Sequence, residues 1–426
     1  MPGNIPPPKQ ATPQGTARYA SRFSEYEVNG FFNRSHQELT LSSFGIGTYK
    51  GEVSDRADEA WATSINCGLR NGINVLDTAI RYRAMRSERI IGRVLKELIE
   101  RGELRRDEIF VSSKGGLISI LEPWERERYV EEKIIQARGF SSNRIYKNMH
   151  CLDADFLAQE IELSLENLGL QSLDCYFLHN PELNLALLGQ EEFYINLYRV
   201  FEMLETQAAD GKIISFGIAS WNGFRRRQGD SWYIDIEKVT TIAHEVAGDR
   251  HCFKYLELPL SIGMPFIYNN RITVPGGGQM SFLERTQALG LDIFTSASLY
   301  EGKLQELFNL QRMMAMVGLR DSEHNEDSVQ VSLPLSENSI VQLFELLVAA
   351  RSREHTLEME LKRASGNCLS PYPAALNLVR SLPEVTCALA GLENINYLEE
   401  SLQLMKMPKI DPSLLRRFFS DLSLSW

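Results

Sequence analysis

Short apolar runs alternate with amphipathic segments along most of the chain. Eight runs have the length and the bounding turn residues of buried strands. They span residues 39–48, 74–79, 108–116, 173–180, 213–220, 252–262, 291–299 and 385–392. Helical periodicity fills the segments between them, and several of these end in glycine, as at Gly72 and Gly169, where a left-handed stop is needed. Alternating strands and helices predict a parallel sheet, and eight such repeats close into a (β/α)8 barrel.

Two long stretches interrupt this alternation. Residues 117–152 follow the third predicted strand, and residues 303–372 follow the seventh. Both begin at the C-terminal ends of strands, which is the face where barrels of this kind carry their active sites. The two insertions are either surface decoration or the walls of a substrate pocket, and we favour the pocket.

The two ends of the chain are predicted to lie outside the barrel, which covers residues 38–405. Residues 1–37 are rich in proline and lack the apolar core of a secretory signal, so we expect a flexible extension. Residues 406–426 form a C-terminal extension. No run of 18 apolar residues occurs, so no membrane span is expected.

Composition and charge narrow the class of protein. The chain of 426 residues has 45 Lys and Arg against 56 Asp and Glu, a formal net charge of −11. Such an acidic surface argues against nucleic acid as a partner. The six cysteines are scattered without paired spacing, as expected of small buried residues in a cytoplasmic protein. The seven histidines lack ligand spacing, so no metal is expected.

Three polar residues stand at the C-terminal ends of successive strands: Asp77, Lys114 and His179. Burying a lone ammonium is costly, so Lys114 needs an anion, and Asp77 on the neighbouring strand supplies one. Tyr82 lies in the loop just after Asp77. A nearby lysine lowers a tyrosine pKa, which would let Tyr82 donate a proton to a carbonyl oxygen while His179 orients the carbonyl. Alone, each residue is more often structural, but together they predict a site that reduces aldehydes or ketones.

These residues also carry a resemblance to the aldo-keto reductase family over about residues 38–405. The segment "DTAIRYRAMRSE" resembles the family's D-T-A-x-x-Y-G-x-S-E, and "SSKGG" and "LDCYFLHNPE" resemble its lysine and histidine strands. "FGIASWNGF" resembles the bacterial branch of predicted oxidoreductases related to aryl-alcohol dehydrogenases. The resemblance implies a catalytic tetrad of Asp77, Tyr82, Lys114 and His179, with Tyr82 as general acid. It also implies reversible hydride transfer between NADPH or NADH and a small-molecule carbonyl or alcohol.

The resemblance further implies that the nucleotide lies across the strand-end face of the barrel. Its residues there would be Ser220, Asn222, Glu257, Ser296, Leu299, Gly302, Lys303, Gly391, Glu393 and Asn394. Glu257 replaces the family's carboxamide-binding glutamine, and an ionised carboxylate accepts hydrogen bonds but cannot donate them. Glu393 replaces the basic residue that holds the 2′-phosphate of NADP, and a carboxylate would repel that phosphate. NADH specificity, weakened nucleotide binding and loss of the cofactor therefore all remain open.

Arg81 and Arg83 flank Tyr82. They are either exposed loop charges paired with Glu88, or pocket cations that select an anionic substrate such as a carboxylate-bearing ketone.

Two further functions stay open. The barrel could have lost its nucleotide and use the tetrad for acid–base chemistry, such as a dehydration or a cyclisation in a biosynthetic pathway. It could also be a regulatory subunit that senses bound nucleotide. The sequence names neither a substrate nor an oligomeric state.

Overall fold

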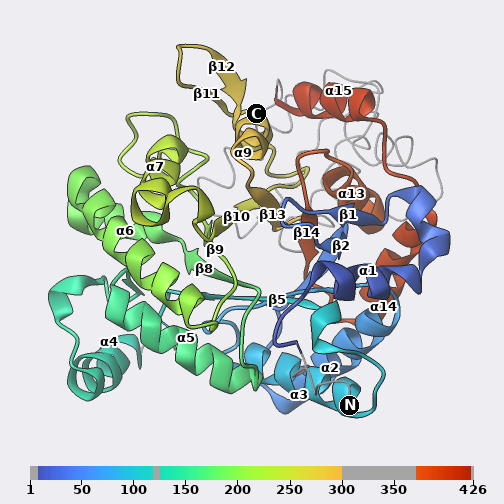
Figure 1. Ribbon diagram of the computed structural model, residues 1–426, viewed down its shortest axis with the longest axis horizontal. Coiled ribbons are helices and arrows are strands. Elements are labelled where there is room, and N and C mark those ends of the chain that lie inside the picture. The colour runs from blue at the N-terminus through green and yellow to red at the C-terminus, as the bar shows by residue number, and fades with distance from the viewer. Residues whose placement is uncertain (1–7, 119–124, 300–370, 424–426) are drawn as a thin grey trace, which may run out of the picture.

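A closed barrel of eight parallel strands forms the centre of the molecule (Figure 1). The computed structural model describes residues 8–118, 125–299 and 371–423. In order around the barrel, the strands are β3 (Phe44–Gly47), β4 (Val75–Asp77), β5 (Phe110–Gly115), β8 (Cys175–His179), β9 (Phe216–Ala219), β10 (Phe253–Pro259), β13 (Asp292–Ser296) and β14 (Cys387–Ala390). Each strand falls within one of the eight predicted runs, so the barrel is confirmed.

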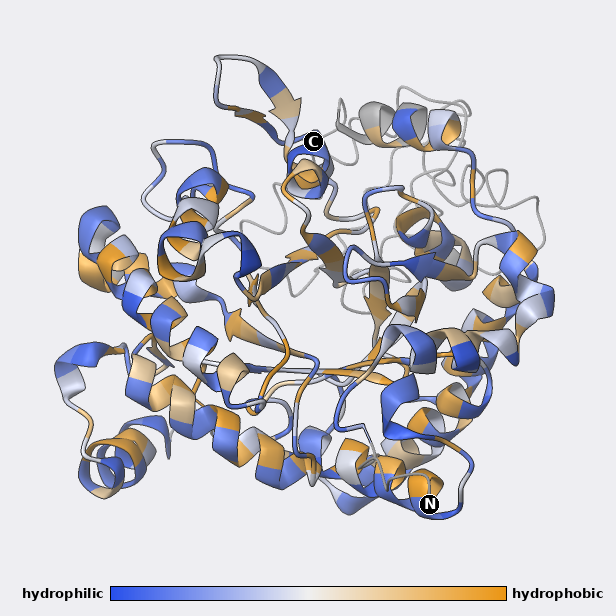
Figure 2. Ribbon diagram, in the orientation of Figure 1, coloured by the Kyte–Doolittle hydropathy of each residue, from blue (hydrophilic) through white to orange (hydrophobic). Residues whose placement is uncertain are grey.

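Helices surround the barrel on the outside (Figure 1). They are α2 (Asp55–Arg70), α3 (Arg86–Glu100), α5 (Ala154–Leu168), α6 (Leu185–Ala209), α7 (Ile236–Ala247), α9 (Phe282–Ala288), α13 (Pro371–Arg380) and α14 (Ile395–Leu402). Each helix mixes hydrophobic and hydrophilic positions along its length (Figure 2). Helix α3, for example, buries Ile91, Leu95 and Leu98, which the helical repeat places on one face. Helix α5 ends at Gly169, whose φ of 62° is the left-handed stop that the sequence predicted.

The interior of the barrel is packed and closed at its N-terminal end. The rings of Phe110, Phe177, Tyr255 and Phe294 contact one another there, with centroids 5.3–6.5 Å apart. Leu41 joins the same cluster from a hairpin of β1 (Phe32–Arg34) and β2 (Thr40–Ser42). The first predicted strand is therefore divided, with its beginning in this hairpin and its end in the barrel. Only the C-terminal end of the barrel is left to hold a site.

The N-terminal extension is folded rather than flexible where it is described, so that expectation was wrong for residues 8–37. Helix α1 (Pro13–Ser21) packs against the barrel through Tyr19, which is fully buried. The Tyr19 hydroxyl donates to the carbonyl oxygens of Leu69 and Ile73, at 2.6 and 3.0 Å. The proline that suggested flexibility, Pro13, starts the helix, where its missing N–H is not needed.

A compact excursion separates β5 from α5. It contains α4 (Arg126–Tyr129), a π-helical turn (Val130–Gln136) and a hairpin of β6 (Ile145–Tyr146) and β7 (His150–Cys151). Ile118, Ile134 and Phe140 belong to its own small core. The other predicted insertion, residues 303–372, lies almost wholly outside the described residues.

Shorter elements complete the described chain. They are η1 (Ser24–Asn29), η2 (Arg106–Glu108), η5 (Ser142–Arg144), η6 (Pro181–Asn184), η7 (Gly248–Arg250), α8 (Phe266–Asn269), β11 (Arg271–Thr273), β12 (Gln279–Ser281), η9 (Gln403–Lys406) and α15 (Pro412–Ser423). Helix α15, in the predicted C-terminal extension, contacts α8 through Phe419, which stacks on Tyr268 at 4.7 Å between ring centroids. No helix in the described ranges is long and apolar enough to cross a membrane.

Candidate active site

A cavity of about 710 Å³ opens at the C-terminal end of the barrel. The loops that follow the strands build its walls, with Tyr49 after β3, Tyr82 after β4, Trp221 after β9 and Leu299 after β13. Leu117 and Met149, from the excursion after β5, line it too, as the pocket-wall interpretation of that segment requires. Cavities of this size commonly hold small molecules or cofactors.

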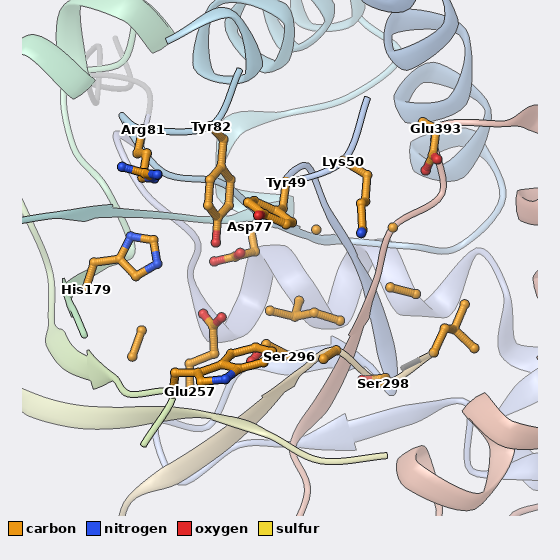
Figure 3. Close-up of a pocket in the computed structure, with 18 of the residues that line it drawn as sticks. Tyr49, Lys50, Asp77, Arg81, Tyr82, His179, Glu257, Ser296, Ser298 and Glu393 are labelled. Atoms are coloured by element: carbon orange, nitrogen blue, oxygen red, sulfur yellow. The ribbon is translucent and has the colours of Figure 1, made fainter. Parts of the chain in front are cut away.

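The structure brings the four predicted catalytic residues together. Asp77 ends β4, His179 ends β8, and Lys114 is the last residue but one of β5. The Lys114 ammonium donates to the Asp77 carboxylate and, at 3.0 Å, to the Thr78 carbonyl oxygen. The same ammonium lies 5.0 Å from the centroid of the Tyr82 ring, and the rings of Tyr82 and His179 are 5.7 Å apart. Figure 3 shows the side chains of Asp77, Tyr82 and His179 pointing toward one space.

Glu257 enters the same group from β10 (Figure 3). Its Oε2 lies 3.2 Å from the Lys114 Nζ and makes no hydrogen bond to any described residue. Lys114 thus has two buried carboxylates, Asp77 and Glu257, as neighbours. One ammonium cannot neutralise two carboxylates, so the group favours a proton on one of them.

The electrostatics place that proton on Glu257. Burial, followed by the nearby charge of Asp77, raises the pKa of Glu257 to about 8. Burial alone would lower the pKa of Lys114, but Asp77 and Glu257 outweigh it and raise that pKa above its ordinary value. Lys114 therefore stays charged. Burial also raises the pKa of Asp77, but the hydrogen bonds from Lys114 and Ser112 oppose the rise, so the shared proton favours Glu257.

Tyr82 differs from the expectation of a lowered pKa. Burial raises the pKa of Tyr82 above its ordinary value, while Lys114 opposes the rise. The predicted lowering of the pKa followed from Lys114 alone, because the burial of Tyr82 cannot be read from the sequence. Burial, with Lys114 and Arg81 adding to it, holds the pKa of His179 well below its usual range, so the imidazole is neutral. Tyr82 and His179 thus both meet a ligand as neutral groups that can donate hydrogen bonds.

The loop that carries Tyr82 is held in an unusual conformation. Arg83, Ala84 and Met85 have successive φ values of 49°, 52° and 70°, in the left-handed region that residues other than glycine rarely occupy. Arg83 is buried below this turn, where it pairs with Asp58 and donates to the Glu52 carbonyl oxygen at 2.9 Å. Arg83 does not line the cavity. Of the two arginines predicted as alternatives, Arg81 lines the cavity.

The predicted nucleotide residues fall into three groups. Those that line the cavity are Ser220, Glu257, Ser296, Leu299, Gly391 and Glu393. Asn222 and Asn394 do not line it. Asn222 instead accepts a hydrogen bond from Arg225, and Asn394 caps helix α14. Gly302 and Lys303 lie outside the described residues. The cavity therefore collects six of the ten.

Sequence reasoning missed Tyr49, Lys50, Asn180 and Trp221, which also line the cavity. Lys50 extends into the cavity between Tyr49 and Glu393 (Figure 3). Their position in the sequence could have identified Tyr49 and Lys50. They come just after the first barrel strand, at the same end of the barrel as Asp77, which ends the second strand. Within the described ranges, no group of three His, Cys, Asp or Glu residues is placed to hold a metal ion.

Comparison with known proteins agrees with this geometry. The model of the Aldo/keto reductase family matches residues 43–244, which include all four tetrad positions. Over this segment, a little under half of its length, the chain is similar to the aldo-keto reductase family.

Two curated proteins similar to this chain have different activities. An NADH-specific methylglyoxal reductase of Escherichia coli (strain K12) is 28% identical over 188 residues, which are 43% of this chain and 49% of that protein. A D-threo-aldose 1-dehydrogenase of Pseudomonas sp is 28% identical over 188 residues, with the same shares. The matched segment thus spans about half the length of these relatives.

Solved structures of the family share the fold over nearly the whole chain. A glycerol dehydrogenase from Gluconobacter oxydans has a TM-score of 0.58 at 17% identity, covering 92% of this chain and 95% of its own. An aldo/keto reductase from Klebsiella pneumoniae in complex with NADP and acetate has a TM-score of 0.54 at 15% identity, covering 91% and 94%. At such identities the likeness establishes the barrel alone.

The cavity's donors fit one end of a nicotinamide dinucleotide better than the other. Glu257, as a carboxylic acid, offers both a donor and an acceptor, which is what a carboxamide needs. Trp221 offers an aromatic face, and Lys50 offers a cation for a diphosphate. Glu393 and Glu400 line the same cavity. Their carboxylates suit hydroxyl groups rather than an additional phosphate.

Proposed function

We propose that this protein is an oxidoreductase that transfers hydride reversibly between a nicotinamide cofactor and a small carbonyl or alcohol compound. The observation that carries the proposal is the placement of the Lys114 ammonium, held by Asp77, beneath the Tyr82 ring at the closed end of the cavity. Tyr82 as proton donor and the neutral imidazole of His179 then face the cavity, and the fixed cation of Lys114 lies buried behind Tyr82, an arrangement suited to carbonyl reduction.

The protein's own groups divide the work. A bound reduced nicotinamide would supply the hydride to the carbonyl carbon. Tyr82 donates its hydroxyl proton to the carbonyl oxygen, and the fixed charge of Lys114 stabilises the phenolate that this leaves. His179, held neutral, donates a hydrogen bond that orients the carbonyl. The high pKa of buried Tyr82 keeps the proton in place until charge develops on the substrate oxygen.

We infer that NADH is preferred to NADPH. Glu393 follows β14 at the rim of the cavity, with no ion pair to any described residue. A carboxylate at that position repels a 2′-phosphate and accepts a hydrogen bond from a free ribose hydroxyl. The Escherichia coli relative is itself an NADH-specific enzyme, which supports the same direction.

Glu257 supports a second candidate function, non-redox acid–base catalysis without a nucleotide. A buried carboxyl group with a pKa of about 8 beside Tyr82 is suited to move a proton in a dehydration or a cyclisation. The third possibility, a sensor of bound nucleotide, would need no turnover at all.

One experiment separates the three functions. The purified protein is titrated with NADH and with NADPH while the quenching of tryptophan fluorescence is followed, since Trp221 lines the cavity. Carbonyl compounds are then screened by loss of the absorbance of reduced nicotinamide. Binding with turnover supports the oxidoreductase, and binding without turnover of any carbonyl favours the sensor. Absence of binding at millimolar nucleotide would overturn the redox proposal and favour acid–base chemistry.

A further inference from the structure

Arg81 lies at the edge of the cavity and has no charged partner among the described residues. Its one hydrogen bond runs from Nη1 to the Ile118 carbonyl oxygen at 3.2 Å, and no carboxylate of a described residue lies within ion-pair distance. A guanidinium has five N–H donors, so several of them remain for a ligand. Figure 3 places this side chain beside Tyr82, on the same side of the cavity as His179.

Two buried arginines of the described chain show the pairing that Arg81 lacks. Arg83, two residues later, is paired with Asp58. Arg380, fully buried, donates to a side chain or carbonyl oxygen from each of its three nitrogens. Arg81 is half-buried, and burial, with the charge of Arg126 adding to it, lowers its pKa below the ordinary value, although Tyr49 and Tyr82 oppose the change. An anion that entered the cavity would compensate the charge of Arg81.

The charges of the cavity are also divided along its length. Arg81 and neutral His179 stand on one side of Tyr82, while Glu257 and Asp77 lie below it and Glu393 lies at the far rim (Figure 3). Lys114 is already paired with Asp77, and Lys50 lies beside Glu393 on the side that we assign to the nucleotide diphosphate. An anionic substituent on a substrate at Tyr82 is therefore attracted toward Arg81. The division therefore gives an anionic substrate one orientation, with its carbonyl at Tyr82 and its negative group at Arg81.

We propose that the substrate is an oxo acid, an aldehyde or ketone that carries a carboxylate, and that Arg81 binds this carboxylate. The inference rests on the proposed redox function. The carbonyl carbon gains a hydride from reduced nicotinamide, and the carbonyl oxygen gains the proton of Tyr82. The oxo acid is reduced to a hydroxy acid, the nicotinamide is oxidised, and the carboxylate is unchanged. A single guanidinium matches a carboxylate through two parallel hydrogen bonds.

The first test compares each oxo acid with its primary amide, which has nearly the same shape and no charge. A series with one to four bonds between carbonyl and carboxylate is assayed with NADH. We expect kcat/KM to favour the acid over the amide in the unaltered protein. Arg81→Gln should lower kcat/KM for the acid by about 10- to 100-fold, the range of a charged hydrogen bond, and should leave the amide nearly unchanged. Arg81→Lys keeps the charge without the fork and should lie between the two.

Arg126→Gln is the matched control. Arg126 lies near enough to act on the charge of Arg81, but it does not line the cavity. Loss of a general positive field would affect both variants, whereas loss of a contact affects Arg81→Gln alone. Equal effects in the two variants, or equal effects on acid and amide, would overturn the assignment. So would a preference for glyceraldehyde 3-phosphate over every carboxylate in the series.

A second readout does not depend on turnover. Binding of the hydroxy-acid products is measured by titration calorimetry, and Arg81→Gln should weaken their dissociation constants by about 10- to 100-fold. Binding that depends on Arg81 without any nucleotide turnover would keep the anion site and remove the redox function. Turnover of neutral carbonyls with no effect of Arg81 would keep the redox function and remove the anion site. Matching melting temperatures verify that each variant is folded.

Discussion

The buried ammonium of Lys114 lies 3.2 Å from the carboxyl group of Glu257, which lines the cavity, although Lys114 already has Asp77 as its counter-ion. The second carboxyl group is the main departure of this site from a simple lysine–aspartate pair. It comes from β10, on the opposite side of the barrel from β4 and β5, and it is almost fully buried. Its protonation state therefore couples the folding of the barrel and the binding of ligands to pH.

The stability of the protein should fall as pH rises, in part because of Glu257. The folded-state pKa is about 8, whereas the ordinary value is 4.5. Between these values the folded protein keeps a proton that the unfolded chain has lost, so raising the pH favours unfolding across this window. Glu257→Gln removes this contribution. The variant should gain on the order of 2–4 kcal/mol over the unaltered protein between pH 5 and pH 9, measured by urea unfolding.

Exposed Glu191 supplies the control for that measurement. Glu191→Gln changes the same chemical group in solvent and should leave the difference between the two pH values unaltered. Parallel stability curves for the unaltered protein and Glu257→Gln would show that Glu257 titrates normally.

Binding of NADH should weaken above about pH 8 for a related reason. Only the protonated form of Glu257 can donate a hydrogen bond to a carboxamide oxygen. The dissociation constant, followed by fluorescence, should rise by about tenfold from pH 6.5 to pH 9.5, as expected for loss of a hydrogen bond next to a charge. In Glu257→Gln, which keeps a donor at all pH values, the dissociation constant should be nearly constant. A rise of the same size in this variant would assign the titration to another group.

Tyr82→Phe should abolish most of the carbonyl reduction while nucleotide still binds. Removing a general acid lowers kcat by about 10²- to 10⁴-fold. The phenylalanine ring keeps the edge contact with His179 and the contact between the ring face and the Lys114 ammonium. The measurement is kcat under saturating carbonyl together with the dissociation constant of NADH. A kcat within a few-fold of the unaltered enzyme would exclude Tyr82 as the proton donor.

The barrel was predictable because each of its strands is a continuous apolar run, such as the one that ends in β8 (Cys175–His179). Buried parallel strands leave this signature, and the alternating helices set the order. The N-terminal segment was not predictable in the same way. Its proline content suggested flexibility. Its attachment depends on Tyr19, a single side chain whose hydroxyl donates to carbonyl oxygens 50 and 54 positions away in the sequence.

The site was predictable to the extent that strand ends share one face. Asp77, Lys114 and His179 followed from that rule, whereas Arg81 and Arg83 did not. They lie in an irregular loop where three successive left-handed residues redirect the chain, so neighbouring side chains point in unrelated directions. The regular side-chain spacing of helices and strands does not apply in such a loop, so the sequence cannot show which way each side chain points. The raised pKa of Tyr82 was equally hidden, since burial is a property of the folded chain.

Glu393→Gln should shift nucleotide preference toward NADPH. Removing a carboxylate from the rim of the cavity removes a repulsion of about 1–2 kcal/mol at a surface site, which corresponds to a change of about 5- to 30-fold in relative affinity. Titrations with NADH and NADPH give the ratio of the two dissociation constants. Glu399→Gln is the control, because Glu399 is exposed on helix α14, which begins just after Glu393, and does not line the cavity. An unchanged ratio in Glu393→Gln would place the 2′-position elsewhere.

Arg83→Gln should impair both the stability of the protein and its turnover, although Arg83 touches no ligand. Its buried guanidinium pairs with Asp58 and holds the Glu52 and Ser54 carbonyl oxygens below the left-handed turn that carries Tyr82. Breaking a buried ion pair from one side costs about 3–5 kcal/mol. The turn would then relax toward ordinary backbone angles and displace Tyr82, so kcat should fall while the dissociation constant of NADH changes less.

Arg86→Gln separates this role from a general loss of charge around Asp58. Arg86 also pairs with Asp58, at 2.6 Å, but its side chain is partly exposed. Such a pair contributes about 0–1 kcal/mol, so Arg86→Gln should unfold close to the unaltered protein and keep its kcat. If Arg83→Gln and Arg86→Gln lose equal stability and activity, the turn is held by the net charge around Asp58. If only Arg83→Gln loses stability and activity, the buried contacts of the Arg83 side chain set the position of Tyr82.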